Sequence, residues 1–161
     1  MNPLALLEGF GYSKRQILAT YAKLCLGKDM DATVSNEYAC AASVNAVVRN
    51  AIGEPIGGGA STYNMLKALQ HSLCWRQIKI ADAEAGDVII AATGTRTAPS
   101  NILNGHVGII GDTIGAGKFP KKVYSNNSLT GKWSAHFTIG SFFDKYNFIG
   151  KYPVHLYRLI Y

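Results

Sequence analysis

The spacing of apolar residues changes between residues 75 and 86, and this change limits the folds open to the chain. Up to about residue 75 the apolar residues recur at steps of three and four, the spacing of amphipathic helices. From Gly86 they fall in short β-rich runs separated by Gly, Pro and Asn, a pattern typical of an antiparallel sheet. We therefore predict an α+β fold, with a helical part over about 1–75 and a sheet part over about 86–161. The N-terminal helices are expected to pack on one face of the sheet.

Local signals place three helices in the first part. One is expected over 13–27, with Ser13 as its N-cap, and another over about 61–71. The helix between them carries Cys40 and ends at Gly53, which readily adopts the left-handed conformation that ends a helix. In the second part, strands are expected at 86–92, 105–112, 121–127, 136–140 and 154–160.

Size and cysteine content indicate one folded domain. The chain has 161 residues, of which 48% are hydrophobic and 16% charged, enough to bury a core of its own. We predict a single domain over 1–161. Three cysteines, an odd number without CxxC spacing, argue against a disulfide framework and against a zinc site. We expect reduced thiols and no metal or other cofactor.

The charge balance narrows the choice of partner. A formal net charge of +6 favours an anionic partner such as nucleic acid, a membrane surface or an acidic wall polymer. The basic residues are scattered, and the sequence has neither a recognition helix nor an aromatic RNA-binding motif, so no nucleic-acid partner is expected. The charge does not choose among the other anionic partners, and a cell-wall polymer stays open as one of them.

The N-terminal segment indicates where the protein is made. It has no basic residue before its short apolar stretch, and Glu8 interrupts that stretch. It therefore has the pattern of neither a signal peptide nor a membrane span. We expect synthesis in the cytoplasm, no stable membrane insertion and a monomeric protein.

Cys40 begins an apolar helical stripe. Three valines follow it at steps of four, seven and eight, which places Cys40 in the first turn of its helix, with Ser35 or Asn36 as N-cap. The N-terminus of a helix favours a thiolate and makes a cysteine a better nucleophile. The alternative is a small buried hydrophobic residue. That packing role is expected for Cys25 and Cys74.

His106 is the candidate for the base that such a cysteine needs, and the alternative is a structural histidine. Strand alternation places His106 and Ile110 on one face, so if Ile110 faces the helices, His106 faces the helix of Cys40. An imidazole there would take the thiol proton and later protonate a leaving amine. Neighbouring glycines leave room for a substrate. Structural roles are expected for the other three histidines, His71, His136 and His155.

A third polar group would orient the imidazole, and the next strand offers Ser125, Asn126 and Asn127. If Val123 points inward, Ser125 and Asn127 share its face, and Asn127 is the preferred candidate. A β-bulge would bring Asn126 to the ring instead. The alternative interpretation of this Asn-Asn-Ser run is a turn.

These residues together resemble a known family. ACAASVNAVVRNAIG, GDVII and GHVGIIGD, in that order, resemble the NlpC/P60 and CHAP cysteine peptidases, which are papain-like hydrolases of bacterial peptidoglycan. The resemblance covers about residues 36–130. YSNNSLTGKWSAHFT and a later PVHLYRL strand are similar to the catalytic domain of bacteriophage endolysins and extend it further. Ala39, Ala41 and Ala42 depart from the acidic residue and the Ser-Gly that often flank the cysteine in this family.

The resemblance implies a papain-like NlpC/P60 fold and a bacteriolytic activity. Cys40 would be the nucleophile, His106 the base and acid, and Asn127 or Asn126 the orienting residue. The enzyme would need no cofactor and, once released from the host cytoplasm, would degrade the cell wall. It would cleave an amide of the wall peptide as an endopeptidase or as an N-acetylmuramoyl-L-alanine amidase. The alternatives are a non-catalytic wall-binding or virion structural module on the same fold, and a papain-like amidase with a non-wall substrate.

Overall fold

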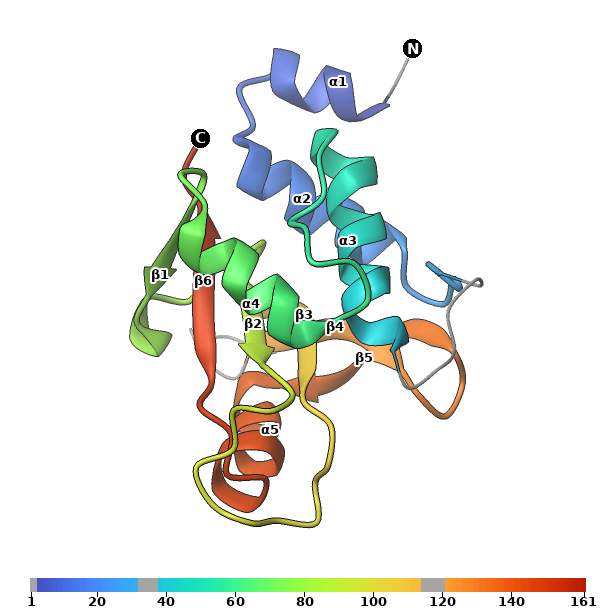
Figure 1. Cartoon of the computed structure of the whole chain (residues 1–161). Coiled ribbons are helices and arrows are strands. Elements are labelled where there is room, and N and C mark those ends of the chain that lie inside the picture. Colours follow the sequence, from blue (N-terminus) through green and yellow to red (C-terminus); the bar gives the residue numbers. More distant parts are fainter. Residues whose placement is uncertain (1–2, 32–37, 114–120) are drawn as a thin grey trace.

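The structure is a computed structural model, and it describes residues 3–31, 38–113 and 121–161 (Figure 1). Its helices are α1 (Pro3–Gly9), α2 (Lys14–Leu24), α3 (Ala39–Ile52), α4 (Thr62–His71), a 3₁₀ turn (Ile80–Asp82), α5 (Ile139–Phe143) and a π-helix (Asp144–Ile149). Its strands are β1 (Trp75–Ile78), β2 (Val88–Ala91), β3 (His106–Thr113), β4 (Lys121–Asn127), β5 (Lys132–Thr138) and β6 (His155–Leu159).

The six strands form one sheet in the order β1-β6-β2-β3-β4-β5, and every neighbouring pair is antiparallel. The predicted α+β class with an antiparallel sheet is therefore confirmed. Strand β1 was not expected from the sequence. It pairs with β6, with Trp75 opposite Leu159, and so forms one edge of the sheet.

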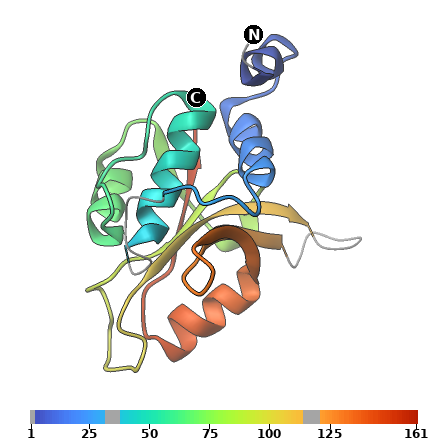
Figure 2. The ribbon, with the colours of Figure 1, turned by 90° about the vertical axis from the view of Figure 1, so that its right-hand side faces the viewer.

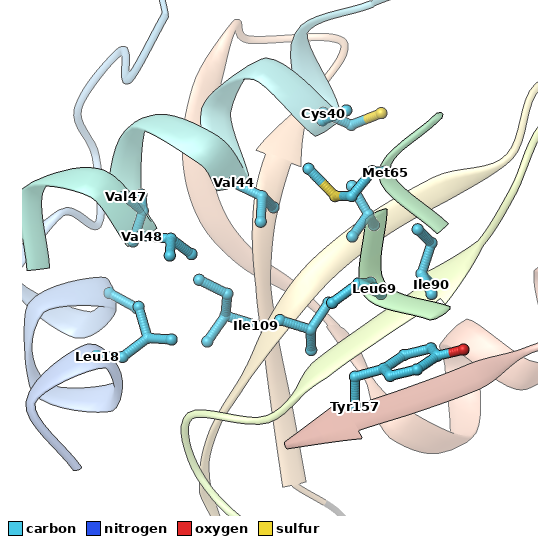
Figure 3. Close-up of a cluster of buried hydrophobic side chains, with 14 of the residues drawn as sticks. Leu18, Cys40, Val44, Val47, Val48, Met65, Leu69, Ile90, Ile109 and Tyr157 are labelled. Atoms are coloured by element: carbon cyan, nitrogen blue, oxygen red, sulfur yellow. The ribbon is translucent and has the colours of Figure 1, made fainter. Parts of the chain in front are cut away.

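One face of the sheet is covered by α2, α3 and α4, as the sequence predicted (Figures 1 and 2). The valine stripe of α3 is buried in this first core. Figure 3 shows Val44 and Val48 projecting from α3 toward Ile109 of β3, with Cys40 at the margin of the cluster. Burying each such aliphatic side chain contributes roughly 1.5–3 kcal/mol, so this packing determines which face of α3 meets the sheet.

The opposite face is also covered, and here the sequence-based expectation was incomplete. Helix α5 and the π-helix form a second core on that side with Ile110, Val123 and Leu156 (Figure 2). The sequence analysis assigned 136–140 to a strand and no helix after it. The strand ends at Thr138, where a capping box begins α5: Thr138 Oγ1 accepts from the Ser141 N–H at 3.1 Å.

The expected start of α2 and the expected end of α3 are observed, whereas α2 ends at Leu24, before Gly27. Ser13 caps α2 in a capping box with Gln16, and α3 ends at Gly53, whose φ of 94° is left-handed. The residue before α3 is Tyr38, which makes no side-chain capping bond. The expectation that Ser35 or Asn36 is the N-cap was therefore wrong, and both of these residues lie outside the described ranges.

A buried ion pair joins the start of β2 to β6. The Asp87 carboxylate is fully buried and accepts from Arg158 Nε at 2.9 Å, from Arg158 Nη2 at 2.7 Å and from the Glu84 N–H at 2.7 Å. This two-pronged contact satisfies a charge that would otherwise be costly to bury. The Gly-Asp motif before β2 therefore has a structural role.

Candidate active site

Cys40 lies in the first turn of α3 and is 7% exposed. Burial raises the pKa of the Cys40 thiol from 9.0 to about 11. The backbone N–H groups of Ala41, of Val107 and of Cys40 itself lie close to the sulfur and lower this pKa, because they favour the thiolate. The Val107 contact brings the thiol against β3, next to His106.

His106 begins β3, but its side chain does not lie on the face that the sequence predicted. Ile110 belongs to the second core, against α5, and the His106 ring lies on that same face. Val107 and Ile109 face the N-terminal helices, among them α3, which carries Cys40. Alternation along β3 is as predicted, but the assumption that Ile110 faces the N-terminal helices was wrong.

An aromatic enclosure surrounds the His106 ring. The ring stacks on Tyr146 at a centroid distance of 5.5 Å and an angle of 9°, with Phe137 at 5.7 Å and Phe142 at 6.0 Å. Burial, with a smaller contribution from the charges of His136 and Lys145, lowers the pKa of His106 from 6.5 to about 3. The imidazole is therefore neutral at physiological pH.

Cys40 and His106 nevertheless line the same cavity. This space of about 600 Å³, called here the histidine cavity, is bordered by Cys40, His106, Asn126, His136, Lys145 and Tyr146, among others. Both residues reach it because the first turn of α3 and the first residue of β3 lie at the same end of the sheet. Among the described residues, the imidazole hydrogen-bonds to a hydroxyl and not to the Cys40 sulfur.

That hydroxyl is Ser125 on β4, whose Oγ lies 2.9 Å from His106 Nε2. Val123 and Ser125 both face the α5 side, as alternation from an inward Val123 predicts. Gly108 makes room for this contact, because a Cβ there would lie 2.6 Å from Val123 Cγ1 and 3.1 Å from Ser125 Cβ. Ser125 was one of three candidates on this strand but was not the preferred one.

Asn126 and Asn127 both border the histidine cavity. Among the hydrogen bonds of the described residues, neither of them bonds to the His106 ring. Asn127 Oδ1 accepts from the Leu129 N–H at 2.9 Å, which is the turn contact that the sequence left open. Asn126 is 2% exposed and lines the cavity wall. Whether either asparagine takes part in catalysis stays a prediction.

Cys40 also borders a second space, the α4 cavity, of about 410 Å³. Its wall contains Tyr38, Thr62 and Thr93, and no charged side chain is among its described lining residues. Thr93 connects α4 to the residue before His106. Its N–H donates to Thr62 Oγ1 at 2.9 Å, and its Oγ1 accepts from the Gly105 N–H at 2.9 Å. The thiol therefore lies between two cavities.

Two site residues escaped the sequence analysis. Lys145 and Tyr146 belong to the π-helix, and both line the histidine cavity. The run of apolar and aromatic residues after Thr138 had no clear period, so it gave no signal for a helix there. A π-helix is itself rare and is frequently found at functional sites.

Cys25 is buried in the first core and Cys74 is partly buried against it, which agrees with the packing roles expected for them. Within the described ranges, no group of three potential metal ligands gathers in one place. No helix among the described residues has the length and apolar character that crossing a bilayer requires.

Comparison of the chain with protein-family models gives no match, and comparison with curated proteins gives none either. The resemblance to the NlpC/P60 and CHAP peptidases therefore depends on the residues quoted above alone.

Proposed function

We propose that the protein is a papain-like thiol hydrolase of the NlpC/P60 and CHAP type, which cleaves an amide bond of the bacterial cell-wall peptide as a phage endolysin does. The observation that carries the proposal is the shared histidine cavity: a cysteine in the first turn of a helix and a histidine on the adjacent strand border one open space. The wall as substrate follows from the family resemblance and from the net charge of +6.

The reaction begins from a neutral pair. With the Cys40 pKa near 11 and the His106 pKa near 3, the resting site holds a thiol and a neutral imidazole. His106 takes the thiol proton as Cys40 Sγ attacks the amide carbonyl. The Cys40 N–H, in the first turn of α3, is a donor for the oxyanion that forms beside the sulfur.

The second half of the reaction returns the proton. The imidazolium of His106 gives its proton to the leaving amine, and a thioester to Cys40 remains. Neutral His106 then removes a proton from water, which attacks the thioester and releases the acid and the thiol.

We assign the ring-orienting role to Ser125 in place of the asparagines. When Ser125 Oγ accepts from Nε2–H, the free lone pair is on Nδ1, which becomes the proton acceptor. Asn126 and Asn127, which line the same cavity, would then contact the substrate.

One observation favours a non-catalytic wall-binding or virion module on the same fold: no hydrogen bond joins the Cys40 sulfur to the imidazole among the described residues. The two functions differ in a simple experiment. Purified peptidoglycan is incubated with wild type, Cys40→Ala and Cys25→Ala, and turbidity and released fragments are followed. The hydrolase requires loss of activity in Cys40→Ala alone. Wall binding without any new amine or carboxyl end in the wild-type digest would establish the module instead.

A further inference from the structure

Lys145 is the feature of the site that the mechanism above does not use. It lies on the π-helix, one residue before Tyr146, whose ring stacks on His106. Its Nζ lies 5.6 Å from the Phe137 ring centroid and 5.4 Å from the Tyr146 ring centroid. The ammonium group is thus held over the aromatic enclosure at the wall of the histidine cavity.

No anionic side chain among the described residues of the cavity neutralises this ammonium. None of its described lining residues is an Asp or a Glu, and none of the ion pairs among the described residues involves Lys145. An exposed cation beside a reacting centre, without an acidic partner, complements a negative charge on the substrate. A carboxylate is the anion that a peptide offers.

The position of His106 shows which half of the substrate would carry that carboxylate. The imidazole protonates the leaving amine, so the amine half of the substrate lies in the histidine cavity. The acyl half then extends past Cys40 into the α4 cavity, which has no charged side chain among its described lining residues.

We propose that Lys145 binds a free carboxylate on the residue that supplies the leaving amine, so that the substrate is a peptide acidic on that side. This inference rests on the proposed hydrolase. It adds a specificity determinant on the π-helix and a substrate class, amine-side acidic peptides.

The test uses the wall stem peptide L-Ala-γ-D-Glu-meso-diaminopimelate-D-Ala, with free carboxylates and with the same carboxylates converted to amides. Calorimetry on the Cys40→Ala protein measures both affinities without turnover. We expect the acidic peptide to bind about tenfold more tightly, because charged hydrogen bonds are stronger than neutral ones. Adding Lys145→Met removes that preference, and adding Lys145→Arg keeps it.

Lys67→Met is the matched control. It removes one positive charge from an exposed position of α4 that borders neither cavity. If Lys145 causes the preference, Lys67→Met keeps the ratio of the two peptide affinities measured for the Cys40→Ala protein. An equal loss of preference in Lys67→Met, or an unchanged preference in Lys145→Met, overturns the proposal. A role of Lys145 limited to lowering the His106 pKa predicts that unchanged preference.

Kinetics of the protein with Cys40 intact distinguish the effects of carboxylates on the two halves of the substrate. Amidation on the amine side of the cleaved bond should lower kcat/KM about tenfold, mainly through KM, whereas amidation on the acyl side should have little effect. The reverse pattern overturns the proposal. Absence of all hydrolysis, together with a Lys145-dependent binding preference, would reject the hydrolase and keep the carboxylate site. Hydrolysis without that preference would reject the carboxylate site alone.

Discussion

The Nε2 atom of His106 lies 2.9 Å from the hydroxyl oxygen of Ser125, across the β3–β4 pair. The contact exists because Gly108 has no Cβ, which would otherwise meet Val123 and Ser125. A hydroxyl therefore stands where the sequence analysis expected an amide.

Replacing Ser125 with alanine should lower kcat roughly ten- to a hundredfold with little change in KM, since an orienting group contributes less than the general base itself. Steady-state kinetics on a soluble wall peptide measure this. Combining Ser125→Ala with His106→Ala should be little worse than His106→Ala alone, because residues acting as one unit are not additive. If Asn127→Ala or Asn126→Ala gives the large loss and Ser125→Ala remains near wild type, our assignment of the ring-orienting residue is wrong.

Cys40→Ala and Cys40→Ser should abolish lysis of cell-wall suspensions and leave the circular dichroism spectrum unchanged. Cys25→Ala removes a fully buried thiol from the first core and should lower the free energy of unfolding by on the order of 1 kcal/mol. Its activity per folded molecule should be retained, as should that of Cys74→Ala. A lytically inactive but folded Cys74→Ala would show that the nucleophile is not Cys40.

Acid should destabilise the fold through His106. Because its pKa is lowered from 6.5 to about 3, the folded protein leaves the ring neutral in that window while the unfolded chain binds a proton. The stabilisation is present above pH 6.5 and is lost as the pH falls toward 3, at roughly 1.4 kcal/mol per pH unit. Urea unfolding at pH 6.5 and at pH 4.5 should show a stability loss about 2 kcal/mol larger for wild type than for His106→Gln. Equal losses would mean that the ring is already charged in the folded state.

Replacing Arg158 should lower the free energy of unfolding more than replacing an exposed cation. Arg158→Met leaves the fully buried Asp87 carboxylate without its partner, for which about 3–5 kcal/mol of destabilisation is expected. Lys23→Met is the control, because it breaks the exposed Lys23–Asp112 pair and should change stability very little. Chemical denaturation compares the two, and similar midpoints would show that Asp87 finds another partner.

The sequence was sufficient for the elements whose apolar residues face a single partner. The valine stripe and Gly53 located α3, and the capping signal at Ser13 located α2. It was not sufficient for the faces of β3. Ile109 and Ile110 are both buried because both faces of the sheet are covered, so no polar residue marked an outer side.

The sequence pattern was also insufficient to predict the π-helix and to choose among Ser125, Asn126 and Asn127. The π-helix has no 3.6-residue repeat from which a helix could be predicted, and it carries the Lys145 and Tyr146 side chains into the site. The pairing of β4 with β5 shifts between Val123 and Ser125, and such irregularities depend on tertiary contacts that a single sequence does not display.

The place of β6 has a consequence for synthesis on the ribosome. This strand, His155–Leu159, lies between β1 and β2 and pairs with both, so no neighbouring strand can bridge them in its absence. The Asp87 carboxylate likewise has its ion-pair partner only after Arg158 has been synthesised. Cys40 and His106 are therefore synthesised well before β6, the strand that connects β1 to the rest of the sheet. Domains fold as units during translation, so the mature site should form only after residue 159 has left the exit tunnel.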